Sequence, residues 1–232
     1  MKISRRLFLW LCVSAALFSP LSAVEAYLQT GAPDPLLLIP PPPLVGSVED
    51  VADRDAAFRI YSSHTKADVE RGKNENILSV FHFSNVVGAW FQPGKLPKTE
   101  ALFRQVETET RTITNTAKNF WNRKRPYVAD PTRVPDPIDP EAKPSASYPS
   151  GHSTRGALYS ILLTELFPDK KDALFIRGRE MGWTRIQGGV HTPYDIFAGR
   201  VLGQALAQGF LRSPSFQHDL AEAKTEIAAA AK

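Results

Sequence analysis

The stretch TRIQGGVHTPYD, residues 184–195, joins two predicted helices and carries an arginine, a histidine and an aspartate. The glycines at 188–189 predict the end of the first helix, and Thr192-Pro193 predicts the N-cap and first position of the second. Asp195 then falls at the third helical position, where it can complete a capping box. It also follows His191 by four residues, and a carboxylate bonded to Nδ1–H leaves Nε2 available as a nucleophile. The capping role and the catalytic role are compatible.

A second motif, Pro149-Ser150-Gly151-His152, ends a proline-rich loop at the start of another predicted helix. A helix N-terminus presents unpaired backbone N–H groups that bind anions, and Gly151 lets a ligand approach the backbone closely. Ser150 adds a hydroxyl donor, and His152 would lie beside the bound anion. For this motif alone, an ordinary helix cap with a surface histidine is the alternative interpretation.

Lys118 and Arg125 form a third motif, in which the arginine is followed by Pro126. Their spacing corresponds to two helical turns, so we expect both side chains on one face near the end of one helix. A solvated basic helix end is the alternative. With Arg185, the motifs supply three cations, two imidazoles and one carboxylate. This set suits a tetrahedral oxyanion, of which a phosphate monoester is the commonest example.

Helical patterns dominate the chain and strand patterns are scarce, so the sequence predicts an all-α, single-domain helical bundle over residues 47–232. Pro126 is expected to end the longest helix. The proline-rich residues 127–148 that follow are expected to form a functional loop, with Tyr148 as a wall of the pocket. The predicted helices span residues 50–72, 97–121, 153–167, 169–187, 192–211 and 214–231.

The N-terminal residues carry two further predictions. Residues 1–26 combine a basic start, an apolar run and a small-residue cleavage site, which predicts an export signal and a mature start at Tyr27. Arg5-Arg6 also fits the twin-arginine pattern, so the general (Sec) and twin-arginine routes both stay open. Either route gives a periplasmic or secreted protein. Residues 27–46 are rich in proline and predict an extended arm that wraps the domain.

Charge and cysteine content exclude several classes of function. The formal net charge is +4, of which residues 1–26 contribute +2, so the remainder favours neither a nucleic acid polymer nor a membrane as partner. Beyond residue 26 no apolar run in the sequence is long enough to span a bilayer. The single cysteine, Cys12, lies in the predicted signal, which excludes thiol catalysis in the mature chain.

The three motifs together resemble the signature of the PAP2 phosphatase and vanadium haloperoxidase superfamily. They read Lys118-x6-Arg125-Pro126, Pro149-Ser150-Gly151-His152 and Arg185-x5-His191-x3-Asp195. The resemblance extends to bacterial class A non-specific acid phosphatases through residues 39–47, 147–152 and 213–217, and so covers nearly all of the mature chain. Thr184 departs from the pattern, which has serine before the arginine.

The resemblance implies a phosphatase that needs neither metal nor cofactor. His191 would attack phosphorus and form a phosphohistidine, Asp195 would orient His191, and His152 would protonate the leaving group. The phosphate oxygens would be bound by Lys118, Arg125, Ser150, Gly151 and Arg185.

The implied substrates are small phosphate esters, including nucleotides, sugar phosphates and aryl phosphates, with phosphate transfer to alcohols as a further activity. Related phosphatases are often homo-oligomers. Because His191 has to be neutral while His152 has to be protonated, we predict a bell-shaped rate profile on the acidic side of neutrality.

The alternatives use the same residues differently. In a vanadate-dependent haloperoxidase, His191 would ligate vanadium instead of attacking phosphorus. An exported phosphate-binding protein without turnover would need the cations but neither histidine. A zinc hydrolase built on His152, His191 and Asp195 would place its metal beside three cations, which repel it.

Overall fold

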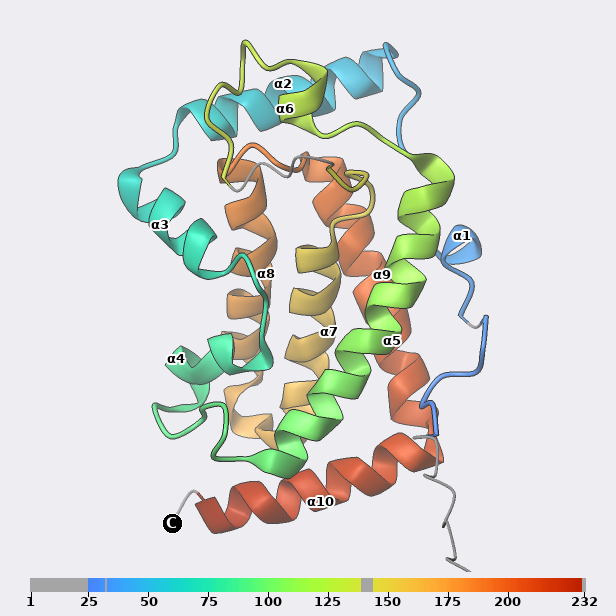
Figure 1. Cartoon of the computed structure of the whole chain (residues 1–232), viewed down its shortest axis with the longest axis vertical. Coiled ribbons are helices and arrows are strands. Elements are labelled where there is room, and N and C mark those ends of the chain that lie inside the picture. Colours follow the sequence, from blue (N-terminus) through green and yellow to red (C-terminus); the bar gives the residue numbers. More distant parts are fainter. Residues whose placement is uncertain (1–24, 32, 139–143, 231–232) are drawn as a thin grey trace, which may run out of the picture.

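Helices α7 (Gly151–Leu166), α8 (Lys171–Gln187) and α9 (Pro193–Arg212) lie together at the centre of the computed structural model, which describes residues 25–31, 33–138 and 144–230 (Figure 1). These residues contain helices and no strand, so the all-α prediction is confirmed. The other helices are α1 (Pro35–Leu38), α2 (Val48–Ser62), α3 (Lys66–Asn74), η1 (Val80–Phe83), α4 (Ser84–Val87), α5 (Pro97–Trp121), α6 (Pro126–Ala129), η2 (Pro168–Lys170) and α10 (Pro214–Ala230).

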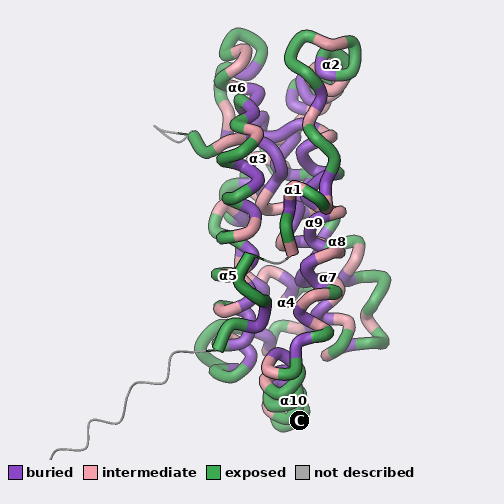
Figure 2. Tube along the Cα trace, turned by 90° about the vertical axis from the view of Figure 1, so that its right-hand side faces the viewer, coloured by how far each residue is buried: buried purple, intermediate pink, exposed green. Residues whose placement is uncertain are grey.

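Glycines bring the backbones of the central helices into contact. A Cβ on Gly156 would clash with the carbonyl oxygen of Gly178, and a Cβ on Gly203 would clash with that of Thr154. Helix α7 therefore packs closely on both α8 and α9, and the buried residues follow the inner sides of these helices (Figure 2). As a result, the N-terminal ends of α7 and α9 meet the C-terminal end of α8 at one end of the bundle.

Helix α5 packs along the front of this core, and α10 crosses its base (Figure 1). Leu102 and Val106 on α5 are buried in the core. Glu226 of α10 caps the start of α5, because its carboxylate accepts hydrogen bonds from the backbone N–H groups of Lys98 at 2.9 Å and Thr99 at 2.8 Å. This cap satisfies two of the donors that a helix N-terminus leaves unpaired. It also fixes the direction in which α5 runs toward the upper end of the bundle.

The predicted span of the long helix, residues 97–121, is confirmed, but the prediction that Pro126 ends it is wrong. Helix α5 ends at Trp121, because Asn122 adopts a left-handed conformation with φ of 45°. Asparagine tolerates this conformation better than most residues, so it can reverse the chain where a proline would only interrupt it. Arg125 consequently lies outside α5, as the N-cap of the short helix α6. The prediction that Lys118 and Arg125 share one helical face is therefore also wrong.

The predicted helix over residues 50–72 is two helices. Helix α2 ends at Ser62, and Thr65 starts α3 with a capping box in which the Thr65 hydroxyl accepts from Asp68 N–H and the Asp68 carboxylate accepts from Thr65 N–H. The polar residues between the two helices contain this start signal, which the apolar periodicity concealed. The break lets α2 cross the top of the bundle while α3 descends along α8 (Figure 1).

The arm begins with Tyr27, which is buried against the rings of Phe210 and Phe216. It contains the one-turn helix α1, so its extended character is interrupted. Tyr148 is fully buried and donates its hydroxyl hydrogen to the carbonyl oxygen of Pro40, so its predicted place in a pocket wall is wrong and it anchors the arm instead. Residues 1–24 of the predicted export signal lie outside the described residues, and only Glu25 and Ala26 are described. Within those residues, no helix is both long enough and apolar enough to cross a bilayer.

Candidate active site

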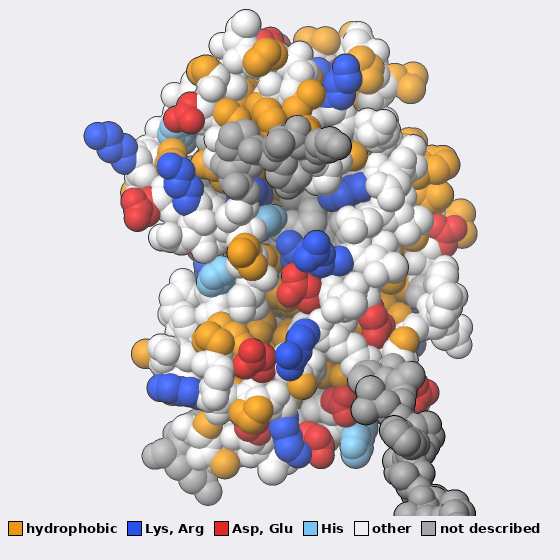
Figure 3. Space-filling model, in the orientation of Figure 1, with side chains coloured by type: hydrophobic (Ala, Val, Ile, Leu, Met, Phe, Trp, Pro, Cys, Tyr) orange, Lys and Arg blue, Asp and Glu red, His pale blue; other side chains and the backbone are white. Residues whose placement is uncertain are grey.

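Side chains from the end of α5, the start of α7, the end of α8 and the turn before α9 border one cavity of about 250 Å³. On the face drawn in Figure 3, basic and histidine side chains gather around a hollow near the middle of the molecule. Of the predicted site residues, those that line this cavity are Lys118, Arg125, Gly151, His152, Arg185 and His191. The tertiary structure thus brings together residues that the sequence spreads over three motifs.

His191 is held from one side through its Nδ1 atom. This nitrogen lies 3.4 Å from Asp195 Oδ2 and 3.3 Å from the Ser147 hydroxyl, which in turn donates to Asp195 Oδ2 at 2.5 Å. Since a carboxylate only accepts hydrogen bonds, Nδ1 carries the proton when it bonds to Asp195. The neutral ring then has its lone pair on Nε2, and the ring borders the cavity.

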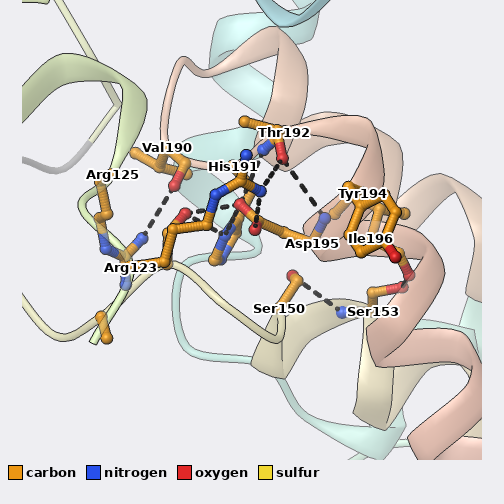
Figure 4. A network of polar contacts seen from close by, with 12 residues as sticks. Arg123, Arg125, Ser150, Ser153, Val190, His191, Thr192, Tyr194, Asp195 and Ile196 are labelled. Carbon is orange, nitrogen blue, oxygen red and sulfur yellow. Dashed lines mark hydrogen bonds and ion pairs between the residues drawn. The ribbon is translucent and has the colours of Figure 1, made fainter. Parts of the chain in front are cut away.

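Asp195 is fully buried and has a partner on each oxygen (Figure 4). Its Oδ2 accepts from the backbone N–H of Thr192 at 2.9 Å, which completes the predicted capping box at the start of α9. Its Oδ1 accepts from Arg123 Nη1 at 2.9 Å. Burial alone would raise the pKa of Asp195, but the hydrogen bond with His191 and the charge of Arg123 hold it below its usual value. Asp195 is therefore a stable carboxylate.

Arg123 connects this carboxylate to helix α2. Its Nη2 atom pairs with Asp50 at 3.0 Å and with Asp53 at 2.8 Å, and its side chain is almost completely buried. Its Nη1 atom also donates to the Thr192 hydroxyl at 2.9 Å. Burial opposes the charge on Arg123, but the neighbouring Asp195 and Asp53 raise its pKa above the usual value. The guanidinium thus fixes the turn before α9 against α2.

The electrostatic surroundings keep the His191 ring neutral. Burial lowers its pKa to about 3, against the opposing effect of its hydrogen bond with Asp195, and the charges of Arg125 and Lys118 lower it further. A neutral imidazole keeps the lone pair that nucleophilic attack requires. His191 is therefore in its nucleophilic form throughout the acidic range above that pKa.

His152 lies on the first turn of α7 and points its Nε2 toward the backbone carbonyl of Glu75, 2.9 Å away. The Glu75 side chain is itself paired with the buried Arg177 at 2.5 Å, which fixes this carbonyl in place. Burial lowers the pKa of His152 well below its usual value, the charges of Arg185 and Arg155 lower it further, and the Glu75 carbonyl opposes them. A bound dianion would offset these cations and restore proton affinity.

The cationic side chains reach the cavity from three directions. Lys118 contacts the carbonyl oxygen of Ala146, and Arg125 donates to the carbonyl oxygen and the hydroxyl of Ser145 at 2.9 Å each. Arg185 donates to the carbonyl oxygen of Gly72 at 3.4 Å. These contacts hold the long side chains in fixed orientations at the cavity. Preorganised cations of this kind stabilise the charge of a bound oxyanion.

Three further positions bear on the predicted phosphate contacts. Gly151 lines the cavity, and a Cβ there would meet no described atom within 4 Å, so packing does not require glycine at this position. Ser150 is the N-cap of α7, is fully buried and is not a lining residue, so its contact with phosphate stays a prediction. The Thr184 hydroxyl donates to the carbonyl oxygen of Met181, which directs it away from the cavity.

Arg123 and Ser147 are the site residues that the sequence analysis missed. Arg123 lies between Lys118 and Arg125 in the sequence, but its acidic partners on α2 lie about 70 residues earlier, so no local pattern marks it. Ser147 stands directly before a recognised motif, but nothing local signals its bond to Asp195. The run of acidic residues at the start of α2 was the only available signal for a buried arginine.

Comparisons with known proteins identify the family of the chain. The PAP2 superfamily matches residues 108–219, which contain all three motifs. A non-specific acid phosphatase from Salmonella typhimurium is 30% identical over 195 residues, covering 82% of this chain and 78% of that protein. An acid phosphatase from Zymomonas mobilis is 30% identical over 242 residues, covering 97% and 91%. The chain belongs to the PAP2 superfamily and, within it, to the class A non-specific acid phosphatases. Its relatives support a phosphatase function.

A more distant similarity is found among solved structures. A transmembrane PAP2-type phosphatidylglycerolphosphate phosphatase from Bacillus subtilis superposes with a TM-score of 0.47 at 19% identity, covering 69% of this chain and 83% of that one. This similarity is too low to assign a substrate or a location.

Proposed function

We propose that this phosphatase hydrolyses small phosphate monoesters through a phosphohistidine on His191, without a metal ion. The observation that carries the proposal is the neutral His191, held through Nδ1 by Asp195 and Ser147 at the edge of a cavity. The lining of this cavity includes the predicted phosphate ligands Lys118, Arg125 and Arg185. Phosphoryl transfer depends mainly on positioning and on charge neutralisation, and here side-chain cations can supply both.

The steps follow from the positions of the side chains. The Nε2 lone pair of His191 forms a bond to phosphorus while the bond from phosphorus to the ester oxygen breaks. Lys118, Arg125 and Arg185, with the Gly151 N–H and the Ser150 hydroxyl, neutralise and hold the remaining oxygens. The imidazolium of His152 gives its proton to the leaving oxygen, and Asp195 stabilises the positive charge on the His191 ring. Water then attacks phosphorus, breaks the N–P bond and returns a proton to His152.

An alcohol can take the place of that water, which would make the enzyme a phosphotransferase as well. We propose broad specificity that includes nucleotides, sugar phosphates and aryl phosphates. The basic start and apolar run of residues 1–26 support export to the periplasm or medium. Assembly into homo-oligomers, which the resemblance implies, completes the proposal.

The metal-free mechanism is tested by p-nitrophenyl phosphate hydrolysis at pH 5–6 in excess chelator. We expect full activity, together with a phosphoenzyme in rapid-quench samples that is stable to alkali and labile to acid, as phosphohistidine is. Activity lost with the chelator would show a metal-dependent enzyme. Turnover that appears only as halide oxidation with added vanadate and peroxide would show a haloperoxidase, and tight phosphate binding without any turnover would show a binding protein.

The pH dependence follows from the two histidines. Because the pKa of His191 is lowered to about 3, its lone pair is lost only in strong acid, which sets the acidic limb. The pKa of His152 is lowered in the free enzyme, so its proton has to arrive with the substrate, whose monoanion loses it at a pKa of about 6. The kcat/KM profile for p-nitrophenyl phosphate is thus expected to peak between these values and fall toward pH 8. A rate that still climbs above pH 8 would contradict the assignments.

A further inference from the structure

The cavity contains more positive charge than one phosphate group needs. Besides Lys118, Arg125 and Arg185, the described residues that line it include Arg111 and Arg155, with Glu107 as the one carboxylate. Arg111 and Arg155 are not among the predicted cationic phosphate contacts, which are made by Lys118, Arg125 and Arg185. They are therefore the cations of this lining that a single phosphate group leaves available for a second anion.

Arg111 and Arg155 lie on the faces of their helices that carry the phosphate ligands. Arg111 precedes Lys118 on α5 by seven residues, which is two turns or about 10 Å along the helix axis. Arg155 follows Gly151 on α7 by four residues, which is one turn or about 6 Å. The two arginines therefore lie on the same side of the reaction centre, at a distance that one ring of a substrate can bridge.

The surroundings of Arg155 suit a ligand. Its nearest acidic neighbour is Glu107, with Nη1 3.8 Å from Oε1, which is long for a hydrogen-bonded ion pair. Its Nε is enclosed and has no hydrogen-bond partner among the described residues. Buried guanidinium donors are normally satisfied, and a planar carboxylate or a phosphate matches the geometry of the guanidinium group. Arg111 is exposed at the cavity edge and can close on the same anion.

We propose that Arg111 and Arg155 form a second anion subsite, so that preferred substrates are phosphomonoesters with another carboxylate or phosphate about one ring away from the scissile group. This inference rests on the proposed function. The cavity volume of about 250 Å³ equals roughly eight water molecules in the liquid, which accommodates a phosphate and a small second group. A sugar bisphosphate fits this description, and a neutral monoester leaves the subsite unfilled.

The test compares two aryl phosphates of nearly equal shape, 4-carboxyphenyl phosphate and 4-carbamoylphenyl phosphate. The ratio of their kcat/KM values is measured for the wild type and for the Arg111→Gln/Arg155→Gln variant. Differences in leaving group affect both proteins equally and cancel when the two ratios are compared. We expect the carboxylate preference of the wild type to exceed that of the variant by about tenfold to a hundredfold, the usual range for a charge-assisted contact. The preference should also decline at high salt, because Arg111 is exposed.

Arg104→Gln is the matched control, since Arg104 is also an exposed arginine on α5 but does not line the cavity. Its ratio should equal that of the wild type. If the loss of Arg155 unfolds the double variant, the single Arg111→Gln variant still tests the subsite, because Arg111 is at an exposed helix position. We expect this single variant to lose part of the preference for the carboxylate ester. Equal ratios in the wild type and in the variants would overturn the subsite while leaving the phosphatase intact. A wild type that hydrolyses neither ester would overturn the proposed function, and the subsite with it.

Discussion

His191→Ala is expected to lower kcat for p-nitrophenyl phosphate by roughly 10⁴-fold or more, because it removes the imidazole lone pair that the proposed mechanism uses to attack phosphorus. The phosphoenzyme should disappear from quenched samples. Removal of the ring leaves a gap next to Asp195 and Ser147, so added imidazole is expected to restore part of the rate by entering that gap. The measurement is a steady-state assay with and without free imidazole.

His218→Ala provides the matched control, since His218 is exposed on α10 and does not line the cavity. It should keep wild-type kcat. His218 also belongs to the group of side chains, with Asp219 and Glu222, that come close enough to share a metal ion among the described residues. Unchanged activity of this variant would separate that group from catalysis. Retention of more than about a tenth of the wild-type rate in His191→Ala would exclude His191 as nucleophile.

Arg123→Met is expected to destabilise the fold by about 3–5 kcal/mol, since it removes the buried cation that pairs with Asp195 and Asp53 and leaves Asp50 with Arg54 alone. For a chain of this size the melting temperature should fall by about 2–4 °C per kcal/mol. Loss of the bond to Asp195 should also lower kcat, because His191 loses its fixed orientation. Thermal and urea unfolding, together with the kinetic assay, measure both effects.

The effect of Arg123→Met should depend on pH with a definite sign. In the wild type the pKa values of Asp50 and Asp195 are lowered, so these groups contribute stability that is lost as the pH falls through their folded-state values. Without the cation, burial should raise the pKa of Asp195, whereas Asp50 keeps its hydrogen bond from Gly46 and its ion pair with Arg54. The variant therefore lacks the Arg123 contribution wherever Asp195 would ionise, above about pH 4. The stability deficit of the variant is therefore expected to be larger at pH 6 than at pH 3.5.

A comparison with an exposed ion pair separates the two kinds of charge contact. Lys98 pairs with Glu222 at 3.0 Å, but both side chains are about half exposed, so Lys98→Ala is expected to cost less than about 1 kcal/mol. Equal losses in Lys98→Ala and Arg123→Met would show that Arg123 does not hold α2 against the site.

The sequence predicted what depends on residues close together along the chain. The capping box of Thr192 and Asp195 and the start of α5 at Pro97 were predicted because cap signals act within one helical turn. Local signals gave a wrong prediction where two of them lay close together. The left-handed conformation of Asn122 ends α5 four residues before Pro126, so Arg125 lies on a separate segment.

Residue type and short spacing are enough to predict that the chain is helical and that His152, His191 and Asp195 accompany cations suited to phosphate. How these groups are held depends on contacts between residues far apart in the chain. Arg123 meets Asp50 across 73 positions of the chain, and Ser147 meets Asp195 across 48. Such contacts depend on how closely α7, α8 and α9 pack and on where each helix ends. The close backbone contacts at Gly156 and Gly203 set that packing. The periodicity of the sequence does not indicate which helices these glycines bring together.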